Sequence, residues 1–423
     1  VQALQLERGG LKIDIEKRDD GTWMMTAPLE ARGDETEIDK IIDKIHTAKI
    51  KEFIHEEPKN LVQYGLDSPE IKLTLLIGED KASKTLLIGR KNVDKKGYYA
   101  KRAEQRNVFL LEEDVMEAIP DKAETLRDHS LLAVSTGDVH KMEYVTEGGR
   151  FVLARNQDGA WEIKEPIEEK ADDLQVNDLI TDLKNIKAKE FLDEEKDEFG
   201  FARPQITAKL WKEGVEEPIA VTIGATDEEK NLVYARNMDG HPVGFGKEEL
   251  DKVRKTLFDL RDKTLVSFGK DEVLRMAVRH GEHELVVTQK DEKWLAEKPE
   301  RFKIGDQGDV DRLVWAIDYV TMEEIAEEAK QENLDKYGLD KPRAEFSITL
   351  TDEKSIGPFL IGSSRDDNVY VATAGKPGVY LVEALILDEL KRELGGILDK
   401  TLPEPEDLLK PEEGPEASEK PSD

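Results

Sequence analysis

The sequence predicts an α+β protein made of three tandem copies of one small α+β domain, followed by a disordered acidic tail. The chain has 423 residues, enough for about three domains of ordinary size, each with its own core. The stretches that begin at Val1, Val139 and Val273 carry the same landmarks in the same order. Within each stretch, strand-like alternation and helical periodicity lie in separate segments, which favours an α+β fold over an alternating α/β fold.

The repeat spacing is 138 residues (139 − 1) and then 134 residues (273 − 139). Such a period is longer than the ~20–50 residues of solenoid repeats and fits a whole small domain. We therefore expect repeats at residues 1–135, 136–269 and 270–402, and a tail at 403–423. The shared landmarks are Trp23, Trp161 and Trp294; Tyr64-Gly65, Phe199-Gly200 and Tyr337-Gly338; Pro69, Pro204 and Pro342; and the closing Leu126-Arg127-Asp128, Leu260-Arg261-Asp262 and Ile397-Leu398-Asp399.

Each repeat is expected to begin with a β meander. In the first repeat, residues 1–8 and 11–17 alternate in polarity around Gly9-Gly10, and a turn ending in Gly21 leads into residues 22–26. Gly-Gly and Asp-Gly provide the positive φ angles that tight hairpin turns require. The tryptophan on the third strand is interpreted as a core anchor, with ligand stacking as the alternative.

A helix with a marked start should follow the meander. Asp34, Asp172 and Asp306 stand at equivalent places and are predicted N-caps. Glu37 and Gln175 lie three residues further on, which predicts a reciprocal capping box in the first two repeats. The i, i+3, i+4, i+7 spacing predicts a buried stripe on each helix. The stripe residues are Ile38, Ile41, Ile42 and Ile45; Val176, Leu179, Ile180 and Leu183; and Val310, Leu313, Val314 and Ile317.

The second half of each repeat should contain a short helical turn, antiparallel strands and a short C-terminal helix. Gly65, Gly200 and Gly338 are expected to end the turn in the left-handed conformation. Prolines four residues later launch the next strand. A second set of glycines lies at matching strand ends and predicts a bulge or a close backbone crossing. These are Gly89, Gly224 and Gly362, and the closing helices are expected at residues 112–118, 247–257 and 383–394.

The composition narrows the classes of partner. The net charge of −31 disfavours binding to nucleic acids and to anionic lipid headgroups, and favours cations or basic protein surfaces. There is no cysteine, so disulfides and thiolate metal sites are excluded. No stretch reaches the ~20 apolar residues of a membrane span. Because Val1 already occupies the first repeat position, we expect that a preceding segment was removed, either as a signal or anchor or through an arbitrary choice of end.

Two segments have residues of the metal-ligand type. His280-Gly281-Glu282-His283-Glu284 lies between two apolar strands and is predicted to be a hairpin tip rather than a zinc site. The segment from Gly305 to Asp311 resembles a calcium loop, but it lacks EF-hand spacing and coincides with the predicted helix cap. No nucleophile elbow, P-loop or dinucleotide fingerprint is present. We therefore predict no catalytic residue, no cofactor and no metal site, and expect the protein not to be an enzyme.

The set of landmarks resembles a bacterial repeat family known as domain of unknown function 4340. The matching text runs from Val1 to about Leu402 in three copies and includes Val1–Gly10, Tyr64–Pro69, Leu87-Ile88-Gly89 and Leu126-Arg127-Asp128. The second repeat departs from it with Phe199-Gly200-Phe201-Ala202, and the third has Gly395-Gly396 where the earlier repeats have Arg-Asp. The family offers no active residue to transfer.

The resemblance implies a location and a partner. Such proteins are single-pass, N-terminally anchored and extracytoplasmic, and they accompany ABC-type transporter components similar to those of gliding motility. We therefore expect a non-catalytic accessory or scaffold subunit of an ABC-type membrane complex, on the periplasmic side and held by an anchor before Val1. The alternative is a ligand-binding protein with pockets between repeats. An envelope hydrolase is the remote third reading.

Overall fold

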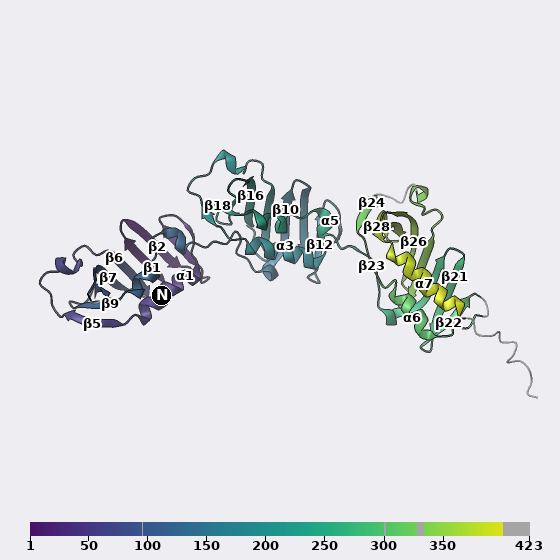
Figure 1. Ribbon diagram of the computed structural model, residues 1–423, viewed down its shortest axis with the longest axis horizontal. Coiled ribbons are helices and arrows are strands. Elements are labelled where there is room, and N and C mark those ends of the chain that lie inside the picture. The colour runs from purple at the N-terminus through teal and green to yellow at the C-terminus, as the bar shows by residue number, and fades with distance from the viewer. Residues whose placement is uncertain (95, 300–301, 328–333, 401–423) are drawn as a thin grey trace, which may run out of the picture. The chain divides into compact units, whose positions relative to one another are not determined.

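The computed structural model describes residues 1–94, 96–299, 302–327 and 334–400 (Figure 1). The predicted α+β class is confirmed, because antiparallel sheets dominate and helices pack against them. The predicted acidic tail, 403–423, lies outside the described residues. The chain forms two compact units, Val1–Arg261 and Asp262–Asp423, so the first two repeats up to Arg261 belong to one unit. Residues 264–267, which the sequence assigned to the end of the second repeat, pair with residues of the third.

The first repeat forms a nine-stranded sheet in the order β4-β3-β2-β1-β6-β7-β8-β9-β5. Two four-stranded meanders therefore meet at β1 and β6, and β5, which follows the helix, lies at the far edge beside β9. The elements are β1 Ala3–Arg8, β2 Leu11–Lys17, β3 Trp23–Ala27, β4 Ala31–Arg32, α1 Glu35–Thr47, β5 Ile50–His55, η1 Val62–Tyr64, β6 Ile71–Ile77, β7 Ala82–Asn92, β8 Gly97–Arg102, β9 Val108–Glu112, α2 Asp114–Ala118 and η2 Ala123–Leu126.

The second repeat has the same strand order, β13-β12-β11-β10-β15-β16-β17-β18-β14. The closing helix predicted at 247–257 is instead three short turns. The elements are η3 Thr136–Asp138, β10 Val139–Thr146, β11 Gly149–Arg155, β12 Trp161–Glu165, β13 Glu169–Lys170, α3 Asp173–Asn185, β14 Glu190–Phe191, η4 Asp197–Phe199, β15 Ile206–Lys212, β16 Ile219–Asp227, β17 Leu232–Arg236, β18 Pro242–Gly246, η5 Lys247–Glu249, α4 Leu250–Val253 and α5 Leu257–Leu260.

Among the described residues, the third repeat forms an eight-stranded sheet in the order β22-β21-β20-β25-β26-β27-β28-β24. Its closing helix is the longest of the three and runs from Leu385 to Asp399. The elements are β19 Thr264–Ser267, η6 Lys270–Glu272, β20 Val273–His280, β21 His283–Lys290, β22 Lys293–Lys298, α6 Gln307–Trp315, β23 Tyr319–Thr321, β24 Glu324–Glu327, η7 Leu334–Tyr337, β25 Ala344–Leu350, β26 Ser355–Arg365, β27 Asn368–Thr373, β28 Lys376–Glu383 and α7 Leu385–Asp399.

The N-cap prediction is confirmed at all three helices. Asp34, Asp172 and Asp306 accept hydrogen bonds from backbone N–H groups of the first turn. The predicted return bond of the capping box is replaced by other contacts. Glu37 pairs with Lys40, and the Gln175 side chain accepts from Lys255, because a nearby ammonium is a stronger donor than a neutral amide.

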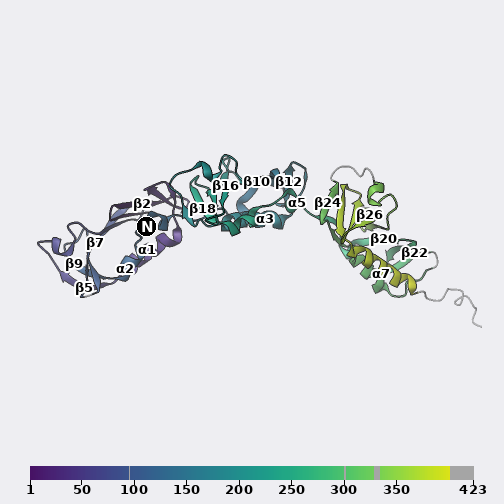
Figure 2. The same ribbon diagram turned by 45° about the horizontal axis from the view of Figure 1, so that its top comes forward.

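The helices cover one face of each sheet, and the core lies between the two layers (Figure 2). Trp23, Trp161 and Trp294 are buried there, which confirms the core interpretation. The apolar stripe is fully buried on α3. On α1, by contrast, Ile38 and Ile41 are buried but Ile42 and Ile45 are half-buried, so the stripe prediction is wrong for half of the first helix.

Candidate functional site

The two histidines singled out from the sequence lie at a hairpin tip, as predicted. His280 ends β20, His283 begins β21, and the two residues face each other across the turn, with Gly281 at φ 60°. Partial burial, helped by the nearby charges of Lys391 and Arg343, holds the pKa of His280 below its usual value. Over the described ranges, no group of three or more metal-ligating side chains comes together.

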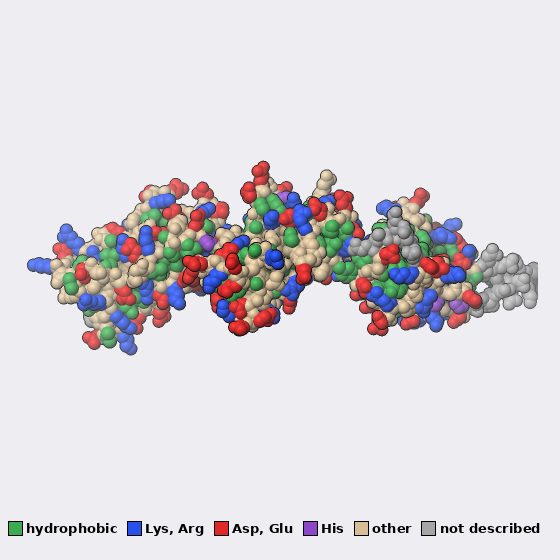
Figure 3. Space-filling view, turned by 90° about the horizontal axis from the view of Figure 1, so that it is seen from above, with side chains coloured by type: hydrophobic (Ala, Val, Ile, Leu, Met, Phe, Trp, Pro, Cys, Tyr) green, Lys and Arg blue, Asp and Glu red, His purple; other side chains and the backbone are tan. Residues whose placement is uncertain are grey.

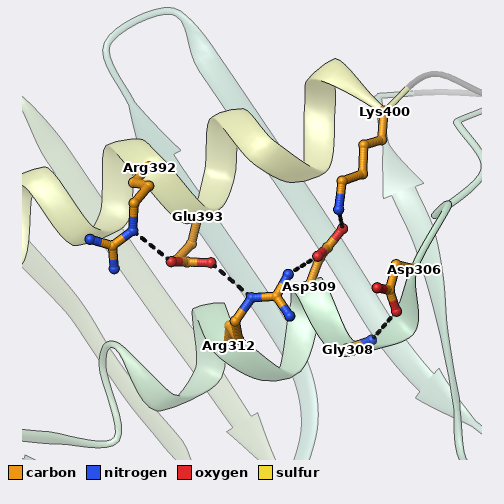
Figure 4. Close-up of polar contacts among 7 residues, drawn as sticks. All are labelled: Asp306, Gly308, Asp309, Arg312, Arg392, Glu393 and Lys400. Carbon is orange, nitrogen blue, oxygen red and sulfur yellow. Dashed lines mark hydrogen bonds and ion pairs between the residues drawn. The ribbon is translucent and has the colours of Figure 1, made fainter.

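The segment that resembles a calcium loop forms a helix cap and an ion-pair network (Figure 4). Asp306 accepts from the N–H of Gly308 at 2.9 Å. Asp309 is only 3 % exposed and pairs with Arg312 and with Lys400, whose Nζ lies 2.6 Å from the carboxylate. Two cations therefore neutralise a buried carboxylate and tie α6 to the end of α7. Sequence reasoning missed this network, although the i, i+3 spacing of Asp309 and Arg312 was a signal.

The repeated tyrosines and glycines form one packing motif. The aromatic residue before each left-handed glycine contacts a tyrosine on the third strand that follows it, with ring centroids 4.3–5.1 Å apart. The predicted left-handed conformation is confirmed, because Gly65, Gly200 and Gly338 have φ of 68°, 73° and 69°. The predicted close backbone crossing at the second set of glycines is confirmed as well. At Gly89, Gly224 and Gly362 the strand meets the carbonyl oxygen of that aromatic residue, and an added Cβ would lie within 2.0–2.2 Å of it.

Polar partners of these tyrosines differ from repeat to repeat. The hydroxyl of Tyr99 accepts from Asn92, whereas that of the equivalent Tyr234 donates to Asp227. In the third repeat, Tyr337, which stands at the position of Tyr64 and Phe199, donates to Glu327. A shared chemical reaction would need the same groups in the same place. The motif therefore holds the second half of each repeat together and shares no reactive group.

The Leu-Arg-Asp sequences form the joints between repeats. The carbonyl of Leu126 accepts from the N–H of Asp34, and that of Leu260 accepts from Asp172. Asp128 and Asp262 each accept from the N–H two residues on, at 2.8 and 2.9 Å. Arg127 is buried, its guanidinium lies 3.9 Å from the ring centre of Phe191, and burial lowers its pKa. Each Leu-Arg-Asp sequence thus ends one repeat by bonding to its helix cap and connects it to the next repeat.

An apolar groove opens in the first repeat between α1 and the sheet. It has a volume of about 640 Å³, and its lining includes Val1, Ile42, Ile45, Ala48 and Ile50. These side chains are half-buried, whereas most of the first-repeat core is fully buried. The lining also includes charged or titratable side chains, namely Asp43, His46, Lys84, Arg102 and Glu104. The apolar part of the wall suits an apolar ligand or peptide.

The comparison with protein families decides the identity of the repeat. The model of Domain of unknown function (DUF4340) matches three times, at residues 23–204, 161–305 and 294–407. The chain belongs to the DUF4340 family. The resemblance inferred from the landmarks is thereby confirmed. Comparisons with curated proteins and with solved structures gave no match.

The family landmarks of this DUF4340 protein are therefore the structural motifs described above. The surface around them mixes acidic and basic side chains on the face that Figure 3 draws. Acidic residues outnumber basic ones, 94 against 63, and many of the basic ones are paired with them. Among the helices described, none is both long and apolar enough to cross a bilayer.

A second, polar cleft of about 510 Å³ lies beside the first N-cap. It is lined by side chains of both signs, among them Lys17, Asp20, Asp128 and Lys187. Lys187 belongs to the second repeat, so this cleft is the feature nearest to the expected pocket between repeats.

Proposed function

We propose that this DUF4340 protein is a non-catalytic, extracytoplasmic accessory or scaffold subunit of an ABC-type membrane transporter complex. The support for the location, the N-terminal anchoring and the class of partner is the family resemblance. The protein is held in place and contacted by its partners, and it does not turn over a substrate.

One observation carries the non-catalytic part of the proposal. The residues that mark the family in all three repeats are engaged in caps, left-handed turns, close backbone approaches and joints. An enzyme with this much repetition would be expected to place a nucleophile, a base or a metal ligand in at least one matching position. The matching positions instead hold Gly, Pro, Trp and capping Asp, which are residues that define backbone geometry.

The net negative charge of the protein supports a partner with a basic surface. A net charge of −31 attracts basic protein surfaces and raises the rate of encounter with them. Salt screens such attraction over about 8 Å at physiological ionic strength. We therefore expect partner binding to weaken as salt is raised.

Affinity purification from native membranes tests the proposal. The protein, expressed in its native host at its native level with a C-terminal tag, should recover the membrane-embedded subunits of an ABC transporter. An unrelated acidic protein with the same tag and a similar net charge is the control for nonspecific attraction. The His280→Ala and His283→Ala variants should recover the same subunits, because both side chains lie at a hairpin tip and have no proposed role in binding.

Two results would contradict the proposal. One is purification in which no transporter subunit exceeds the acidic control. The other is a hydrolytic activity that either histidine substitution abolishes, which would revive the envelope hydrolase reading.

The second candidate is a ligand-binding protein, favoured by the polar cleft beside Asp34. The cleft offers Lys17 and Lys187 to an anion and Asp20 to a cation, while Arg32 and Asp128 pair with each other at 3.7 Å. A screen of small charged metabolites by thermal shift, repeated on Lys187→Ala, distinguishes this function. Stabilisation by one compound that the variant loses would favour a ligand-binding role over a scaffold.

A further inference from the structure

We propose that a pocket of the third repeat is a docking site for a basic segment of a partner protein, in which an apolar side chain lies between two arginines or lysines. This third-repeat pocket has a volume of about 250 Å³ and is lined by β23, the residues around it and the start of α7 (Figure 1). The inference rests on the proposed scaffold role and deepens it, because it names a surface that a partner would contact.

The third-repeat pocket has an apolar interior and acidic surroundings. Val320, Val382 and Ile386 line it and are buried, so its deep part is apolar. Over the described residues, the lining contains three acidic side chains and no lysine, arginine or histidine. The acidic side chains are those of Glu323, Glu383 and Glu389. An electrostatically complementary occupant would therefore carry positive charges around an apolar centre.

Two large apolar side chains of the lining are open to solvent. Tyr319 is 65 % exposed and Leu385 is 55 % exposed. The face of a tyrosine ring attracts a cation, and tyrosine and arginine are enriched in protein interfaces. A contact of this kind already exists in the same repeat, where Lys270 Nζ lies 4.9 Å from the ring centre of Trp315. Tyr319 thus offers a ring to a basic side chain of a partner.

The second repeat provides the comparison for this surface. Glu190 pairs with Gly244 there, and Glu324 pairs with Leu381 in the third repeat. Residues around 190 therefore correspond to those 134 positions later (324 − 190), and residues after 244 to those 137 positions later (381 − 244). Buried helix residues agree with the second offset, and these are Leu250 and Val253 against Leu387 and Leu390.

Two ion pairs of the second repeat have become acidic and apolar residues in the third. Lys189 pairs with Glu248 at 2.8 Å. Lys252 pairs with Glu249, also at 2.8 Å. The residues at the positions of the two lysines are Glu323 and Glu389, and those at the positions of the two glutamates are Leu385 and Ile386. Acids thus replace the cations of this surface, and apolar side chains replace its acids.

Stabilisation of α7 does not account for the whole set. An acidic residue before a helix interacts favourably with its N-terminus, which explains Glu383 beside the N-cap Ala384. This effect falls off within the first turn, so it does not explain Glu389 in the second turn or Glu323 outside the helix. It also leaves the exposure of Leu385 unexplained. A partner segment that covers the pocket accounts for all of these residues together.

Peptide binding to the whole chain tests the assignment. The probe is the fluorescein-labelled peptide Gly-Arg-Ser-Leu-Ser-Arg-Gly, followed by fluorescence anisotropy at about 0.15 M salt. In an extended peptide alternate side chains share one face, so its leucine and both arginines can meet the pocket together. One control peptide has serine in place of leucine, and the other has glutamate in place of both arginines. We expect saturable binding of the probe, at least about tenfold weaker binding of the serine peptide and no binding of the glutamate peptide.

Charge reversal locates the site on the protein. Glu323→Lys combined with Glu389→Lys places the lysines of the second repeat in the third and should weaken binding more than about tenfold. The matched control combines Glu217→Lys with Glu229→Lys, at two exposed acids of the second repeat, and has the same net charge. The control should bind the probe within about twofold of the natural protein, because surface changes away from the site leave its contacts intact.

Removal of one aromatic ring tests the second contact. Tyr319→Ala should weaken binding about threefold to tenfold through loss of the cation–π contact. Phe53→Ala removes a ring of similar exposure, 63 %, from the first repeat and should leave binding unchanged.

Several results would overturn the proposal. They are absence of saturable binding, equal binding of the serine peptide, which would show attraction by charge alone, and equal effects of the pocket variants and their controls. A dimer in sedimentation velocity that Tyr319→Ala dissociates would assign the pocket to a second copy of this chain. A lower sedimentation coefficient of the monomer in Tyr319→Ala would assign it to another part of the same chain. Each of these last two results also overturns the partner assignment.

The pocket test is independent of the scaffold test. If the protein with Glu323→Lys and Glu389→Lys still recovers transporter subunits from membranes, the scaffold role stands and the pocket is not its contact surface. If no subunits are recovered with the unaltered protein, the scaffold role fails, and peptide binding alone decides whether the pocket takes a basic segment.

Discussion

The substitution Gly224→Ala should strongly destabilise the second repeat. Gly224 lies in β16, where the strand passes the turn that ends at Gly200. An added Cβ would lie 2.0 Å from the carbonyl oxygen of Phe199 and 2.9 Å from the ring of Phe201. Carbon and oxygen atoms normally approach to about 3.3–3.6 Å, so the strand and the turn would have to separate by more than ~1 Å.

The magnitude follows from the kind of atom that is in the way. Overpacking of a core usually costs about 1–3 kcal/mol. Because the obstacle is backbone, which cannot rotate aside as a side chain can, we expect the upper end, ~3 kcal/mol. For a domain of roughly 150 residues, this corresponds to a fall of about 6–12 °C in the melting temperature.

Differential scanning calorimetry of the whole chain measures this effect. Gly148→Ala is the matched control, since its Cβ would meet no atom closer than 3.5 Å, and its melting temperature should change by less than about 2 °C. Hydrogen exchange should assign the lowered transition to residues 139–260. If Gly224→Ala melts like Gly148→Ala, the close approach is not a constraint on the fold, and the account of the glycine motif is wrong.

Three further predictions concern single side chains. Gly338→Val should destabilise the third repeat by roughly 1 kcal/mol or more, because φ is 69° there; an unchanged thermal melt would argue against the left-handed cap. Burial raises the pKa of Tyr144 to about 12, and its hydroxyl donates to the carbonyl of Val253. In the unfolded chain this phenol ionises near pH ~10, so its contribution is complete below that pH and is lost as the pH rises through about 12. Alkaline urea unfolding should therefore show a loss of up to ~2–3 kcal/mol over this window in the natural protein and a smaller loss in Tyr144→Phe, and equal losses would refute the assignment. Asp309→Ala should lower stability by about 1–3 kcal/mol, measured by urea unfolding, because Arg312 and Lys400 lose a buried partner but stay half-exposed; an effect below about 0.5 kcal/mol would show that the network adds little.

Local features of the fold were predictable from the sequence. The three capping aspartates, the left-handed glycines and the hairpin at Gly281 depend on torsion angles and on hydrogen bonds within a few residues. Such features are encoded by residue type at one position, so Asp before a helix or Gly after a turn predicts them directly. The α+β class followed from the separation of strand-like and helical segments.

The candidate binding site was only partly predictable. The landmarks predicted that Ile42 and Ile45 would be buried like Ile180 and Leu183, because periodicity reports which side of a helix is apolar and not whether anything covers it. Coverage of that side in the second repeat comes from Leu131 and Leu132, which precede the repeat and are distant from the helix in sequence. The apolar groove was therefore visible only when the three repeats could be compared in space.

The sequence by itself determined the repeat, its helix caps and turn glycines, and its family, because these depend on residue types at fixed spacing. The tertiary structure decided which strands became neighbours. For example, β5 follows α1 in the chain but pairs with β9 at the far edge of the sheet. It also decided that Asp309 is buried between two cations and that Phe53 is left exposed. These outcomes depend on contacts between residues that are far apart in the chain, and no local pattern specifies the energy of such contacts.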